Sequence, residues 1–257
     1  MSSEQQTAAP QTSLSDLIPL IHENSNSLCA FHLQTQVIYL ESDNGFEETP
    51  VIQIFSSESL DNFQEIDETC VPQFQIPLTY DTISTTLSTL LLALADNSSV
   101  LEFGFSHLNA SEIFPEFLNM LTKNSSIKRI CCKSINIDQE STFALLELLS
   151  HKPLEHVCLS RSEIDSSDLE TFFKSLLFSN PSLQSLDLEE CHLSPACVPV
   201  FLQYLPQLTS LQRLGVDFAE SCQEHDQAFS DALCDNFTLT SLFLSTNMPL
   251  CDELVLR

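Results

Sequence analysis

The sequence predicts an α/β repeat protein: a solenoid, or horseshoe, with a parallel β-sheet on its concave side and helices on its convex side, preceded by an N-terminal α+β cap. A short apolar pattern recurs along most of the chain at intervals of 27 to 29 residues, and such self-similarity is the signature of repeat architectures. Each copy is followed by a polar turn and a helical stretch. With 257 residues, 43% of them apolar, the chain can bury a substantial core.

The repeated pattern is an apolar residue at the first, fourth and sixth places of a short segment. It is too short to be a helix face, and it suits a strand that buries one side in a parallel stack. Successive copies start 27, 27, 29, 28 and 28 residues apart. A weaker seventh copy begins at Val71, with Phe74 and Ile76. The six clear copies are Val100, Phe103, Phe105; Ile127, Ile130, Cys132; Leu154, Val157, Leu159; Leu183, Leu186, Leu188; Leu211, Leu214, Val216; and Leu239, Leu242, Leu244.

Helical segments are predicted between these strands. SSDLETFFKSLLFSN begins with Ser167 and Glu170 in capping-box spacing, and LSPACVPVFLQYL has Ser194 as cap and Pro195 at the first helical position. SEIFPEFLNML and ESTFALLELLS fill the same place in their own repeats. The predicted unit is therefore strand, turn, helix.

A unit of this length with an outer helix resembles the ribonuclease-inhibitor-like class of leucine-rich repeats, which includes the Ran GTPase activators, tropomodulins and NOD-like receptors. The resemblance covers roughly residues 71–257, about seven repeats. The segment SLQSLDLEECHLSP has Cys191 where the family has Asn or Cys, and TLTSLFLSTN has Asn247 there. The other copies carry Leu108, Ile135, Ser162 and Ala219 at that place.

Residues 1–70 form the predicted cap, with a disordered start, because a solenoid needs its exposed end covered. SLSDLIPLIHEN reads as an amphipathic helix, and AFHLQTQVIYLES and PVIQIFSS read as strands joined by a turn at residues 43–45. A separate functional domain is the alternative. At the other end, LCDELVLR either improvises a cap, or the chain is truncated, or a partner covers the last repeat.

Charge and targeting features limit the partners. The formal net charge is −27, with 36 acidic residues against 9 Lys and Arg. This charge disfavours nucleic acid and membrane and favours basic proteins, although acidity can also serve solubility alone. No apolar run precedes Leu14, and none is long enough to cross a bilayer. We therefore expect a cytoplasmic protein with reduced cysteines.

In the family that the repeat resembles, the side chains between the buried leucines face the concave surface, and that surface usually binds the partner. Carried onto this chain, the strip holds or adjoins five of the nine basic residues. They suggest a bipolar groove that fixes the register of a protein partner; the alternative is a solvated face. The basic part is Lys128, Arg129, Lys133, His156 and Arg161, the acidic part is Asp187, Glu189, Glu190 and Asp217, and Arg213 lies on the same strip.

Cys131 and Cys158 occupy equivalent places on neighbouring predicted strands, roughly 4.8 Å apart. With His156 nearby, they could form a reversible disulfide or a metal site, but the ligand set is incomplete and we predict no bound metal. Cys132 should point into the core.

Catalysis has little support in the sequence, and we expect neither enzymatic activity nor a cofactor. No G-x-S-x-G, H-E-x-x-H, P-loop or G-x-G-x-x-G pattern occurs. The main expectation is a protein-binding module: an adaptor, an inhibitor, a scaffold or a microbial effector. The alternative is a GTPase-activating protein resembling the Ran GTPase activators. That activity needs an arginine or a water-positioning residue in the early repeats, and no arginine precedes Arg129.

Overall fold

The computed structural model describes residues 14–23, 30–39, 46–55, 74–77, 83–106, 114–133, 145, 147–162, 169–193, 196, 198–218 and 226–244. The chain divides into two compact units. The first unit comprises residues 1–105 and 119–127, and the second comprises residues 106–118 and 128–257. The predicted boundary after residue 70 lies outside the described residues.

The first unit begins with α1 (Leu14–His22) and a hairpin of β1 (Ala30–Tyr39) and β2 (Phe46–Phe55), which pair antiparallel. These elements match the predicted helix and strands; the predicted turn at residues 43–45 lies outside the described part. Leu17 and Ile21 are spaced by one helical turn and fully buried, so α1 contributes an apolar face to the core.

The remaining elements of the first unit are β3 (Phe74–Pro77), α2 (Ile83–Ala95), β4 (Glu102–Ser106) and the second half of α3 (Phe114–Lys123). The strand order is β3-β2-β1-β4. The weak seventh copy of the repeat does not form a parallel strand, contrary to the prediction. Phe74 and Ile76 do lie in a strand, but it pairs antiparallel with β2, because the hairpin offers it an edge.

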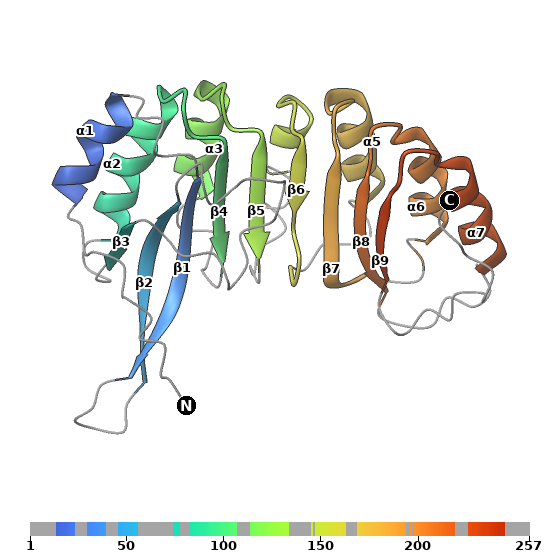
Figure 1. Cartoon of the computed structure of the whole chain (residues 1–257), viewed down its shortest axis with the longest axis horizontal. Coiled ribbons are helices and arrows are strands. Elements are labelled where there is room, and N and C mark those ends of the chain that lie inside the picture. Colours follow the sequence, from blue (N-terminus) through green and yellow to red (C-terminus); the bar gives the residue numbers. More distant parts are fainter. Residues whose placement is uncertain are drawn as a thin grey trace, which may run out of the picture. The chain divides into compact units, whose positions relative to one another are not determined.

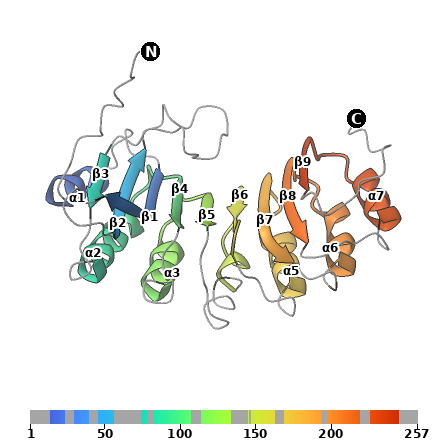
Figure 2. The same ribbon diagram turned by 90° about the horizontal axis from the view of Figure 1, so that it is seen from below.

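The second unit is a parallel sheet with its helices on one side (Figures 1 and 2). Its strands are β5 (Arg129–Lys133), β6 (His156–Cys158), β7 (Ser185–Leu193), β8 (Arg213–Phe218) and β9 (Ser241–Leu244), paired in that order. Every pair from β5 to β9 is parallel. This α/β arrangement, one strand and one helix per repeat, is consistent with a leucine-rich-repeat-like fold.

The helices of the second unit are α5 (Leu169–Ser179), α6 (Val198–Tyr204) and α7 (Asp226–Asp235), with a short 3-10 turn at Leu205–Gln207. A helical turn also includes Leu145 and residues 147–149. The helix α6 begins at Val198, and the predicted caps Ser167, Ser194 and Pro195 lie outside the described residues.

The core of the second unit lies between this sheet and its helices. Leu154, Leu183, Leu211 and Leu239, the first leucines of four repeats, are all buried as predicted. On the helix side, the ring of Phe173 contacts the ring of Phe201 edge to face, with centroids 5.6 Å apart. One apolar layer thus joins successive repeats. A single repeat buries its inner face only by packing against its neighbours.

Candidate functional site

The register of the second unit aligns its side chains in rows that cross the sheet. Successive side chains of a strand point to opposite faces, and in β5 Ile130 and Cys132 are buried while Arg129, Cys131 and Lys133 are half-buried. We call the face turned away from the helices the open face. Two of its rows are Arg129, His156, Ser185, Arg213, Ser241 and Cys131, Cys158, Asp187, Gly215, Phe243.

The basic residues gather where β5 and β6 meet. Arg129 lies in register with His156, and Lys128 precedes it, with its carbonyl accepting hydrogen bonds from the backbone amides of Glu155 and His156. Lys152, which the sequence analysis did not single out, belongs to the same neighbourhood. Burial, together with the nearby charge of Lys128, lowers the pKa of Lys152 to about 8. The structure therefore concentrates positive charge around β5 and in the segment that leads into β6.

Two carboxylates of the predicted acidic part converge over Gly215. A Cβ atom at Gly215 would lie 2.8 Å from Glu189 Cγ and 2.9 Å from Asp187 Oδ1, closer than non-bonded atoms approach, so a larger residue there would displace these two side chains. Asp187 is also a hydrogen-bond acceptor for the Cys158 thiol, at 3.3 Å, and for the backbone amide of Glu189, at 2.9 Å. These contacts place the negative charges of β7 beside Gly215 of the neighbouring strand β8.

Some positions expected to be exposed on the strip are covered instead. Ser160, Ser185 and Asp217 are 8%, 5% and 6% exposed. Neighbouring strands lie only about 4.8 Å apart, and Ser185 lies in register between the longer side chains of His156 and Arg213. Phe243 is 49% exposed in the row of Gly215, which adds an aromatic surface that the sequence analysis did not assign to the site.

Arg161 joins the basic part to the acidic part. Its Nη2 atom lies 2.9 Å from Glu190 Oε1, in an ion pair whose side chains are 57% and 55% exposed. Both residues have positive φ, 60° and 53°, a left-handed conformation that is uncommon for non-glycine residues. An ion pair this exposed contributes at most about 1 kcal/mol, but it offsets one charge of the basic part with one charge of the acidic part.

The two cysteines of the strip are neighbours, as predicted. Cys131 is in register with Cys158 across β5 and β6, and both are free thiols. A hydrogen bond between the two thiols and burial raise the pKa of Cys158. Cys132 points to the other face, where it is fully buried and its pKa is raised by burial.

Ser162, which departs from the pattern of the family that the repeat resembles, makes the same kind of hydrogen bond as Cys191, which fits the pattern. The Cys191 thiol donates a hydrogen bond to the carbonyl of Leu159, 3.0 Å away, in the preceding repeat. Ser162 stands at the same place one repeat earlier, and its hydroxyl donates to the carbonyl of Cys132, 3.1 Å away. A hydroxyl and a thiol thus serve the same position, because each satisfies one backbone carbonyl.

Sequence reasoning missed a set of buried asparagines that precede the strands. Asn180 is 1% exposed, its amide donates to the carbonyl of Leu149, 2.8 Å away, and its oxygen accepts from the backbone amide of Leu154. An Asn three places before the first apolar residue of the triplet was the available signal. It occurs in four of the six clear copies, as Asn97, Asn124, Asn180 and Asn236.

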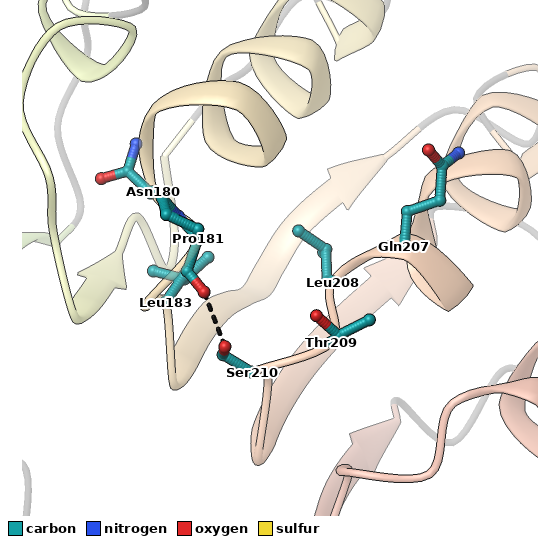
Figure 3. A pocket seen from close by; sticks show the side chains of 7 residues that line it. All are labelled: Asn180, Pro181, Leu183, Gln207, Leu208, Thr209 and Ser210. Carbon is teal, nitrogen blue, oxygen red and sulfur yellow. Dashed lines mark hydrogen bonds between the residues drawn. The ribbon is translucent and has the colours of Figure 1, made fainter.

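A pocket of about 230 Å³ lies between the loops that lead into β7 and β8 (Figure 3). The Ser210 hydroxyl donates a hydrogen bond to the carbonyl of Pro181, 2.6 Å away, along its wall. The lining is neutral, and none of the ten charged or basic residues of the predicted strip contributes to it. The lining residues are Asn180, Pro181, Leu183, Gln207, Leu208, Thr209 and Ser210.

Within the described part of the chain, no group of three His, Cys, Asp or Glu side chains is arranged to hold a metal ion. The helices described there all lack the length and apolar character needed to span a membrane.

Comparisons with known proteins leave the family open. No protein-family model matches the chain, and no curated protein matches it. Among solved structures, the tropomodulin C-terminal domain of Caenorhabditis elegans is similar over 88% of this chain and 94% of that chain, at 12% sequence identity and a TM-score of 0.37. At that TM-score, the likeness assigns neither a family nor a partner.

Proposed function

We propose that the chain is a leucine-rich-repeat protein of the ribonuclease-inhibitor-like class that binds another protein on the open face of its second unit. The observation that carries this proposal is the distribution of charge along the strand order. Arg129 and Lys133 lie on β5, whereas Asp187 and Glu189 lie on β7. Opposite charges therefore occupy separate strands of one face.

The charge order implies the chemistry of the partner. A fitting segment carries acidic residues opposite β5 and basic residues opposite β7, because mismatched charges are penalised on desolvation. The exposed ring of Phe243 offers an apolar contact beside the carboxylates, and aromatic residues often anchor interfaces. The proposed role is binding without catalysis, as an adaptor, inhibitor or scaffold, in the cytoplasm.

A matched pair of charge reversals tests the proposed face. Arg129→Glu changes the open face, and Lys174→Glu changes α5, where Lys174 contacts Glu170 in an exposed ion pair. Each replaces a positive by a negative charge and takes the formal net charge from −27 to −29. Affinity capture should yield a partner with the wild type and Lys174→Glu but not with Arg129→Glu. Equal capture by all three proteins would contradict the proposal.

A further inference from the structure

Cys131 and Cys158 form a pair of thiols on the open face. They are direct partners in the parallel register of β5 and β6 and share a hydrogen bond. Adjacent strands bring in-register Cα atoms to about 5 Å, within the 4.4 to 6.8 Å over which a disulfide closes. The spacing of the two strands therefore permits a disulfide between these residues.

The surroundings of the two sulfur atoms differ. Cys131 is half-buried and is flanked on the same face of β5 by Arg129 and Lys133. Two positive charges thus stand beside the more accessible sulfur, on a protein that otherwise repels anions. Cys158 is 7% exposed, and its sulfur contacts the Ser160 hydroxyl and the Asp187 carboxylate, both at 3.3 Å. Cys131 is suited to meet a reagent from solvent, and Cys158 is suited to react with Cys131.

We propose that Cys131 and Cys158 form a reversible thiol–disulfide site that reacts with anionic low-molecular-weight disulfides such as oxidised glutathione. The Cys131 thiolate attacks the reagent, forms a mixed disulfide and releases one thiol. The Cys158 sulfur then attacks Cys131, and the second thiol leaves with the remaining proton. Two protein thiols are oxidised to one disulfide, and one small disulfide is reduced to two thiols.

The bridge changes the open face between the basic and acidic parts. The bridge removes the thiol proton that Cys158 donates to Asp187. Oxidation therefore takes one hydrogen bond from the Asp187 carboxylate, which lies near the middle of the strip. That consequence rests on the proposed function, whereas the thiol chemistry does not. The experiment below needs no partner, so its failure would leave the proposed binding face standing.

Differential labelling in glutathione buffers tests the site on the full chain. After equilibration at a series of reduced-to-oxidised ratios, the protein is unfolded in urea so that iodoacetamide blocks every free thiol, the buried ones included. Disulfides are then reduced and labelled with N-ethylmaleimide. Trypsin places Cys131 and Cys132 together in residues 130–133 and Cys158 in residues 134–161, so fragmentation of the first peptide separates the two neighbours. We expect the maleimide label on Cys131 and Cys158 together, with iodoacetamide on Cys132.

Intact mass and variants complete the test. The oxidised protein should lose two hydrogen atoms at this pair without adding glutathione, whereas the exposed Cys234 should gain glutathione only. Cys131→Ser and Cys158→Ser should each abolish the bridge, and Cys234→Ser should retain it. Labelling of Cys132 in place of Cys131, or oxidation of the pair no earlier than that of Cys234, would overturn the proposal. The wild-type map decides the matter even if a variant fails to fold.

Discussion

Single buried polar residues carry much of the connection between repeats. Asn180 links its loop to the carbonyl of Leu149 and the amide of Leu154 in the preceding repeat. The hydrogen bonds of such a side chain add little to the free energy of unfolding, because water forms similar bonds in the unfolded chain. Removing the side chain costs more, because it leaves buried backbone groups without a partner. The asparagines are therefore more important to stability than their small size suggests.

Asn180→Ala should lower the free energy of unfolding by about 1 to 3 kcal/mol, because it strands a buried carbonyl and a buried amide. His151 stands at the same place in the preceding repeat but is exposed, so His151→Ala should change stability by less than about 0.5 kcal/mol. Urea denaturation of the two variants measures both values. Similar losses in both would show that the asparagine position has no special role.

Lys152 gives the stability a defined dependence on pH. Burial lowers its pKa from 10.5 to about 8, so between these values the unfolded chain binds a proton that the native state has released. The stability contribution of Lys152 therefore rises with pH across this window. From pH ~7 to ~9.5, the wild type should gain about 1 to 2 kcal/mol relative to Lys152→Met. A constant difference between the two proteins would show that the lysine is not buried with a lowered pKa.

Each strand of the second unit depends on its neighbours for burial of its inner face. Leu186 is 1% exposed and lies in register with Val157 and Leu214. A charge at this position cannot be solvated and has no partner in the apolar layer. Damage to one strand should therefore spread to adjacent repeats.

Leu186→Asp should lower stability by more than about 4 kcal/mol and unfold several repeats together. Leu92→Asp is the matched control, because Leu92 is 63% exposed on α2 and its change should cost less than about 0.5 kcal/mol. Circular dichroism at increasing temperature follows both variants. A Leu186→Asp protein with unchanged helical signal and melting temperature would contradict a continuous core.

The sequence was informative about elements because burial on one face imposes a regular pattern. The strands at Arg129–Lys133, His156–Cys158 and Ser185–Leu193 fall on the predicted apolar triplets. The pattern at Phe74 and Ile76 was misleading because a half-buried strand shows the same alternation whether its neighbour is parallel or antiparallel. Pairing direction is decided by an edge supplied from elsewhere in the chain.

The repeat pattern likewise predicted one part of the candidate site and not the rest. The pairing of Cys131 with Cys158 follows from equal spacing between repeats and needs no further information. The contact of Arg161 with Glu190 joins two residues in the left-handed conformation, and the covering of Asp217 depends on neighbouring side chains. Neither feature is encoded in a local pattern, so both emerged only with the structure.

At the scale of the whole molecule, charge is the property that bears most directly on function. The formal net charge of −27 would repel acidic partners at long range, while the residues on β5 and β6 would attract them at short range. Both effects weaken as salt rises, because charges more than about 8 Å apart are screened at physiological ionic strength. Reversing one charge of the basic part should therefore change the association rate most at low salt.

Association kinetics with the captured partner, measured at two ionic strengths, test the central claim most directly. Arg129→Glu should slow association by about threefold or more at low salt, with a smaller difference at high salt, because it reverses a charge that steers the encounter. Lys174→Glu, with the same formal net charge, should associate at nearly the wild-type rate. If Arg129→Glu bound at an unchanged or faster rate at both ionic strengths, the open face of the second unit would not be the basic surface that recognises the partner.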